Sequence, residues 1–136
     1  MFDKLKYITL SGKEFPYKCD ILVLEKIQDE YPDLADFENK LTGFVPSRDE
    51  EGKIKRNEDG YMIGTTTIPD IKTVNKALCW MVREGLEIEA DDKGLPIEKI
   101  SDKEILRKVD ISPNQLGGLL REEFARCITR KNEETT

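Results

Sequence analysis

The chain contains no histidine, and this absence excludes much of the chemistry that enzymes use. Neither a Ser-His-Asp nor a Cys-His catalytic unit can be built without it. Zinc and iron sites that depend on imidazole are excluded as well. Glycine-rich phosphate loops are also missing, and no carboxylate pair lies in a recognisable acid–base motif. We therefore expect a protein that is not an enzyme and that uses no metal and no cofactor.

Cysteines and long apolar runs are scarce too. Cys19, Cys79 and Cys127 form neither a C-x-x-C pair nor a disulfide framework, and their odd number is typical of a reducing compartment. We interpret them as ordinary, mostly buried thiols. Apolar runs such as residues 21–24 are far too short for a membrane span. The first residues lack the apolar core of a signal peptide, so a cytoplasmic protein without membrane contact is expected.

Charged residues, in contrast, are abundant and of both signs. The 136 residues include 22 Lys and Arg and 28 Asp and Glu, which gives a net charge of −6. Because 38% of the residues are hydrophobic, we expect one modest core and a single domain over residues 1–136. A net negative chain disfavours nonspecific binding to nucleic acid.

Local patterns predict a mostly helical α+β fold with an N-terminal β-hairpin. Residues 7–10 and 15–18 alternate around a turn that contains Gly12, and Pro16 places the second strand at a sheet edge. Apolar periodicity and capping residues then predict five helices, at about 20–31, 34–41, 67–85, 101–109 and 112–131. The first should bury Ile21, Leu24, Ile27 and Tyr31.

The expected limits of the third helix depend on three residues. Thr67 is the expected cap, Pro69 falls in the first turn, and Gly85 ends the helix. Residues 86–89 alternate like a short strand. The acidic stretch 84–92 is interpreted as a solvated rim, with a charged partner-contact edge as the alternative.

Residues 44–66 form a polar insert without helical periodicity, and segments of this kind are often mobile or functional. A turn at 58–60 predicts a second hairpin near 53–63, between residues 53–55 and 61–63. We recognise no internal repeat. Tyr61 and Met62 in this insert are candidate partner-binding residues.

Four further candidates for partner binding lie on predicted helices. Trp80 and Met81 form either part of the core or an exposed apolar patch. Gly117 and Gly118 lie inside the last helix, where each glycine costs about 1 kcal/mol relative to alanine. Their presence indicates the close approach of another element, a kink, or contact with a partner or a second subunit.

Residues 101–131 also allow a different function. A short helix, a break and a longer helix with several basic residues have the order of a helix-turn-helix. Residues 101–136 have no net charge, because seven acidic residues balance the seven basic ones. A small regulatory DNA-binding protein is therefore the alternative, and nucleic acid is not the expected partner.

The order of the predicted elements resembles that of a known family. The resemblance lies in the hairpin of residues 7–16, the helix that ends at 27–31 followed by Asp33-Leu34, the helix at 74–85, and the terminal residues 122–127. This pattern is similar to the small tail assembly chaperones of long-tailed bacteriophages and prophages. The resemblance implies a non-enzymatic protein in a bacterial host cell. Its partners would be the phage tape-measure protein and tail-tube proteins, with self-association as a further option.

Overall fold

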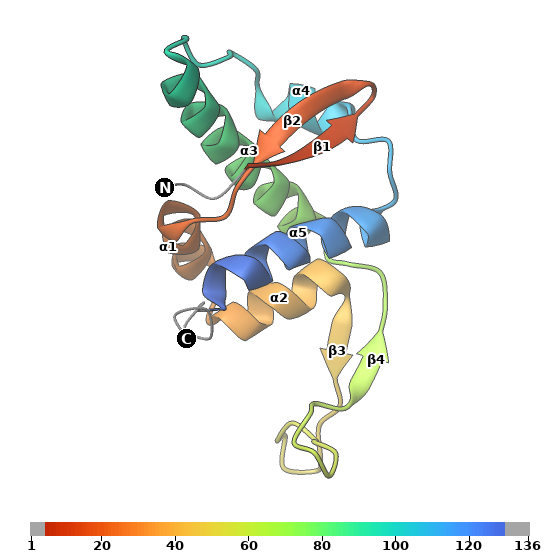
Figure 1. Cartoon of the computed structure of the whole chain (residues 1–136). Coiled ribbons are helices and arrows are strands. Elements are labelled where there is room, and N and C mark those ends of the chain that lie inside the picture. Colours follow the sequence, from red (N-terminus) through yellow and green to blue (C-terminus); the bar gives the residue numbers. More distant parts are fainter. Residues whose placement is uncertain (1–4, 130–136) are drawn as a thin grey trace.

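A computed structural model describes residues 5–129 of the chain. The described residues form five helices and two small antiparallel sheets, arranged as in Figure 1, so the predicted mostly helical α+β fold is confirmed. In chain order the elements are β1 (Lys6–Leu10), β2 (Lys13–Tyr17), α1 (Ile21–Glu30), α2 (Leu34–Thr42), β3 (Phe44–Pro46), β4 (Gly64–Thr66), α3 (Ile71–Lys93), α4 (Asp102–Arg107) and α5 (Pro113–Ile128). No helix in the described part of the chain is long and apolar enough to cross a membrane.

The N-terminal hairpin forms where the sequence predicts it. Ser11 and Gly12, with φ values of 50° and 78°, make the two-residue turn whose left-handed conformations suit a tight hairpin. Ile8 pairs with Phe15, and both side chains are buried. The hairpin packs against α3, where Pro16 lies so close to Gly85 that a Cβ atom there would be 2.5 Å from the Pro16 carbonyl. Gly85 therefore sits inside α3 because β2 leaves no room for a side chain.

This contact corrects the predicted limits of the third helix. α3 begins after Asp70, whose carboxylate accepts the Thr73 N–H, so Thr67 is not the cap and Pro69 precedes the helix. Its left-handed C-cap is Gly94, and residues 86–89 are helical rather than a strand. The alternation of residues 86–89 was misleading because Leu86 and Ala90, four residues apart, lie on the buried face of the helix.

The buried face of α1 also differs from the prediction. Val23 and Ile27 are buried and Leu24 is half-buried, whereas Ile21 is 75% exposed. Because Asp20 caps the helix, α1 begins at Ile21 and turns Val23 and Ile27 towards the core, while Ile21 points away from it. The other predicted helix starts are confirmed, and Ser101 with Glu104 forms a complete capping box.

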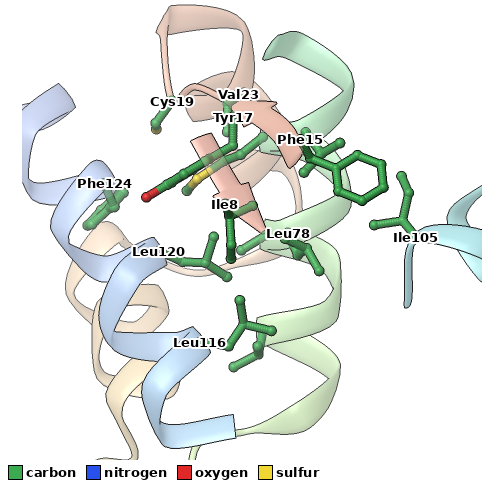
Figure 2. Close-up of a cluster of buried hydrophobic side chains, with 14 of the residues drawn as sticks. Ile8, Phe15, Tyr17, Cys19, Val23, Leu78, Ile105, Leu116, Leu120 and Phe124 are labelled. Carbon is green, nitrogen blue, oxygen red and sulfur yellow. The ribbon is translucent and has the colours of Figure 1, made fainter. Parts of the chain in front are cut away.

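The core lies where α5 packs against both α2 and α3. Figure 2 shows Leu116 and Leu120 of α5 directed towards Ile8 and Leu78, and Phe124 further along the same helix; all five residues belong to the core. The aromatic ring of Phe37 on α2 meets that of Phe124 edge to face at 5.0 Å. α5 ends at Ile128, and the rest of its predicted length, residues 130–131, lies outside the described residues.

Candidate partner-binding surface

The insert between α2 and α3 has a defined hydrogen-bonded conformation. β3 and β4 pair as a short antiparallel stem, with Val45 opposite Thr65. Figure 1 shows this stem extending away from the helices, with two loops at its far end. The predicted turn at 58–60 is present, because Arg56 bridges to Met62 across it. A second turn of the same kind, which the sequence analysis missed, lies at 49–52.

The two turns belong to an internal repeat of eight residues. Residues 48–55 read R-D-E-E-G-K-I-K and residues 56–63 read R-N-E-D-G-Y-M-I. In the first copy the Arg48 guanidinium donates to the carbonyl of Gly52 at 2.8 Å. In the second copy Arg56 donates to the carbonyl of Gly60 at 3.0 Å. The expectation that the chain has no internal repeat is therefore wrong.

The backbone of each copy is closed by the same side-chain contacts. Oδ1 of Asp49 accepts the backbone N–H groups two and four residues later, both at 2.9 Å. Oδ1 of Asn57 does the same at 2.9 and 3.0 Å. The glycines of the two copies have φ values of 86° and 87°, a region that favours glycine. Each copy is thus a self-capped hairpin.

Both hairpins join the stem through a ring of three backbone hydrogen bonds. The Ser47 N–H donates to the carbonyl of Ile63 at 2.7 Å, and the Ile63 N–H donates to the carbonyl of Lys55 at 3.0 Å. The Lys55 N–H closes the ring on the carbonyl of Ser47 at 2.8 Å. These three residues are spaced by eight, the length of the repeat. The ring gives the insert an ordered base that does not depend on a hydrophobic core.

Exposed apolar side chains are concentrated around this stem. Five of the ten large hydrophobic side chains that are exposed in the described chain lie between residues 45 and 71. We call them the stem surface: Val45, Tyr61, Ile63, Ile68 and Ile71. Tyr61 and Ile68 are each 70% exposed. Clustered exposure of this kind is typical of interaction sites.

A hollow of about 640 Å³ opens where the second repeat faces α2 and α5. Tyr61 and Met62 line it from the repeat, and Gly118 lines it from α5. The remaining lining residues are Glu38, Asn39, Thr42, Phe44, Thr66, Arg121 and Glu122. A second hollow of about 570 Å³ lies on the other side of Phe44 and includes Val45, Ile68 and Ile71. The stem is therefore flanked by two depressions whose linings mix apolar side chains with polar and charged ones.

The structure brings three of the six candidate residues together. Tyr61, Met62 and Gly118 share the first hollow. Trp80 is instead half-buried and packs against the core, and Met81 is fully buried. Gly117 is also buried, because a Cβ atom there would lie 2.1 Å from the carbonyl oxygen of Leu41. These other three residues have structural roles.

The basic residues of α5 bind within the molecule. Arg121 pairs with Glu38 of α2 at 2.8 Å. Arg126 pairs with the buried Glu123 at 2.8 Å and also donates to the carbonyl of Cys19 at 2.7 Å. α4 packs against α3, while α5 lies on α2 and α3. These contacts hold both arginines against other parts of the fold.

The acidic stretch at 84–92 contains one perturbed carboxyl group. Glu84 of α3 forms a side-chain hydrogen bond with Asp20, which together with burial raises the pKa of Glu84 to about 7. Nearby, Glu89 accepts a hydrogen bond from the Tyr7 hydroxyl, which raises the pKa of Tyr7 to about 12. No group of three or more Cys, Asp or Glu side chains in the described residues could hold a metal ion.

Comparison with known proteins adds no assignment. No family model, no curated protein and no solved structure matches the chain.

Proposed function

We propose that the protein is a non-enzymatic phage tail assembly chaperone. It would bind the tape-measure protein, tail-tube subunits or both in the cytoplasm of a bacterial host cell during tail morphogenesis. The family resemblance of the sequence provides this identity. The observation that supports it most directly is the stem surface with its two flanking hollows.

The chemistry of this surface suits the apolar side of another protein. Tyr61 and Met62 offer a rigid aromatic ring and an adaptable thioether, two groups that recur at protein-binding surfaces. Asn39, Thr42 and Thr66, which line the first hollow, supply uncharged hydrogen-bonding groups. A chaperone that keeps an assembly component soluble needs such a surface, because it must cover apolar segments before they are buried in the tail.

The proposal is tested by capture of the tagged protein from host cells in which the phage is induced. Mass spectrometry should identify a very long, helix-rich phage protein or the tail-tube subunit. A variant that carries Tyr61→Ser and Met62→Ser should recover much less of it. Both substituted residues are at least partly exposed, so the variant should fold.

One outcome of this experiment would overturn the proposal, and another would move the binding site away from the stem surface. Capture of duplex DNA without a phage structural protein would favour the helix-turn-helix alternative, and its binding should weaken steeply with salt. Equal capture of the same phage protein by the double variant would keep the chaperone role but remove it from the stem surface.

A further inference from the structure

Two of the three cysteines meet away from the stem, at the end of α5. Cys19 lies in the connection between β2 and α1 and is fully buried. Figure 2 shows it beside the part of α5 that carries Phe124. Cys127 lies in the last turn of α5 and is partly exposed. The two thiol groups share a hydrogen bond.

The backbone of Cys19 is held against α5 by two hydrogen bonds. Its N–H donates to Glu123 Oε2 at 2.8 Å, and its carbonyl accepts from Arg126 Nη2 at 2.7 Å. Glu123 and Arg126 are themselves paired at 2.8 Å. Because Cys127 follows Glu123 by one helical turn, it lies on the same face of α5. The arrangement therefore keeps Cys19 and Cys127 next to each other.

The electrostatic surroundings distinguish the two thiols. The hydrogen bond with Cys127, together with burial, raises the pKa of Cys19. The same hydrogen bond and the neighbouring Arg126 guanidinium lower the pKa of the Cys127 thiol, against the effect of burial. Cys127 is thus the better nucleophile and the more accessible one, and Cys19 lies behind it as a second thiol.

We propose that Cys19 and Cys127 are a redox pair that a small-molecule disulfide, such as oxidised glutathione, converts into an intramolecular disulfide. The Cys127 thiolate attacks one sulfur of the small disulfide, whose S–S bond breaks, and one thiolate of the small molecule leaves. The sulfur of Cys19 then attacks Sγ of Cys127 and breaks the mixed disulfide, and the Cys19 proton passes to the departing sulfur, so that the second small thiol leaves. The two protein thiols are oxidised and the small disulfide is reduced to two thiols.

Cys79 has different surroundings and provides the internal control. It is buried on α3, and burial raises the pKa of its thiol to about 12. Its acidic neighbour Asp102 acts in the same direction, which also disfavours the thiolate. Cys79 should therefore remain reduced under conditions that oxidise the other two cysteines.

The new bond would link the β2–α1 connection to the end of α5. Because the loop between residues 19 and 127 contains most of the chain, the crosslink would remove much conformational freedom from the unfolded state. Oxidation should therefore raise the melting temperature, and a reductant should reverse the rise.

The test treats the full, reduced chain with oxidised glutathione, blocks the remaining thiols with iodoacetamide and maps the peptides by mass spectrometry. The wild-type protein should lose two of its three thiols, and a peptide pair linked through residues 19 and 127 should appear. A lasting glutathione adduct without this link, a link that includes Cys79, or the absence of any reaction would overturn the proposal.

Two variants assign the order of the steps. Cys19→Ser should accumulate glutathione on Cys127, because no second thiol can displace it, and Cys79→Ser should form the disulfide as the wild type does. Loss of the link in Cys79→Ser would contradict the proposed pairing. The wild-type peptide map does not depend on how any variant folds.

Discussion

At the scale of single residues, Gly117 and Gly118 are neighbours in α5 with opposite surroundings. The carbonyl oxygen of Leu41 occupies the space that a Gly117 side chain would need, whereas at Gly118 no atom beyond its chain neighbours and the nearby α5 backbone lies within 4 Å of the corresponding position. The fold therefore explains the first glycine. The second has no structural reason within the described chain and faces the first hollow.

Alanine substitutions at these two positions should have opposite effects. Gly117→Ala should destabilise the protein by about 1–3 kcal/mol, because the new methyl group overlaps the α2 backbone. Gly118→Ala should stabilise it by about 0.5–1 kcal/mol, because α5 loses a flexible residue. Urea denaturation of the two variants measures both changes. Equal effects would contradict the close packing of α2 on α5.

Glu123 is the other residue whose environment is unusual, since its side chain is 2% exposed. It accepts hydrogen bonds from Arg126 and from the Cys19 N–H, and Lys6 lies 3.5 Å away. A buried carboxylate that loses its charge leaves its partners unsatisfied. Glu123→Gln should therefore lower the free energy of unfolding by about 3 kcal/mol, which is the lower end of the range for removing one partner of a buried ion pair.

The adjacent exposed residue provides the control for this change. Glu122→Gln should alter stability by less than about 0.5 kcal/mol, as surface substitutions usually do. Chemical denaturation compares the two variants directly. If Glu123→Gln were as harmless as Glu122→Gln, the buried network around Cys19 would not contribute to folding.

At the scale of elements, Glu84 couples α3 to the start of α1. Its side chain forms a hydrogen bond with the side chain of Asp20. The Asp20 carboxylate also caps α1, because it accepts the N–H of Leu22 at 3.1 Å. The folded protein holds a proton on Glu84 up to a pKa of about 7, whereas the ordinary value is 4.5. Between these two values the folded state binds more protons than the unfolded state, so stability falls as the pH rises.

The prediction concerns the pH dependence of the melting temperature. Glu84→Gln keeps a neutral side chain at every pH, so it should remove the decrease between about pH 4.5 and 7. The variant should gain most over the wild type above pH 7. Melting curves of the wild type and the variant over this pH range test the prediction. If the melting temperatures of the two proteins changed with pH in parallel, Glu84 would not hold the proton as inferred.

The duplicated hairpin makes another prediction at this scale. In a variant that lacks residues 48–55, Ser47 would take the place of Lys55. Its N–H would still donate to the carbonyl of Ile63, and its carbonyl would accept the Ile63 N–H, which extends the β3–β4 ladder without a change of register. Because loop closure depends weakly on length, we expect a change in stability of less than about 1 kcal/mol. Urea denaturation measures it, and unfolding of the variant would contradict the ring of three hydrogen bonds.

The sequence alone predicted most elements and their caps, because capping residues act locally. The hairpin turn at Gly12, the capping box at Ser101 and the side-chain cap at Ser112 are examples. The prediction failed where contacts between distant parts of the chain determine the limits of an element. Gly85 is the example, because it lies inside α3 where β2 leaves no room for a side chain. Glu123 occupies a position on the apolar stripe of Leu116, Leu120 and Cys127, and this spacing could have indicated its burial.

The candidate surface was predictable only in part, for the same reason. Tyr61, Met62 and Gly118 were candidates individually, but nothing local placed the insert against α5. The repeat itself was visible as two arginines and two glycines spaced by eight residues. Its significance depends on the backbone ring at Ser47, which only the folded chain displays.

At the scale of the whole molecule, the core and the stem surface are separate parts. β1, β2 and the packed helices bury the large apolar side chains, while the stem extends away from them with its own apolar side chains exposed. This arrangement allows the stem to bind a partner without disturbing the core. It also makes the two repeats separable, since either one can be removed and the ladder kept.

The measurement that tests the account most directly is the affinity of the recovered tape-measure or tail-tube protein for two deletion variants. Deletion of residues 48–55 keeps Tyr61 and Met62, whereas deletion of 56–63 removes both and joins Lys55 to Gly64. The first variant should bind as the full chain does. The second should bind at least about tenfold more weakly, a loss of about 1.4 kcal/mol. Equal affinities, or a loss with the first deletion alone, would contradict the account.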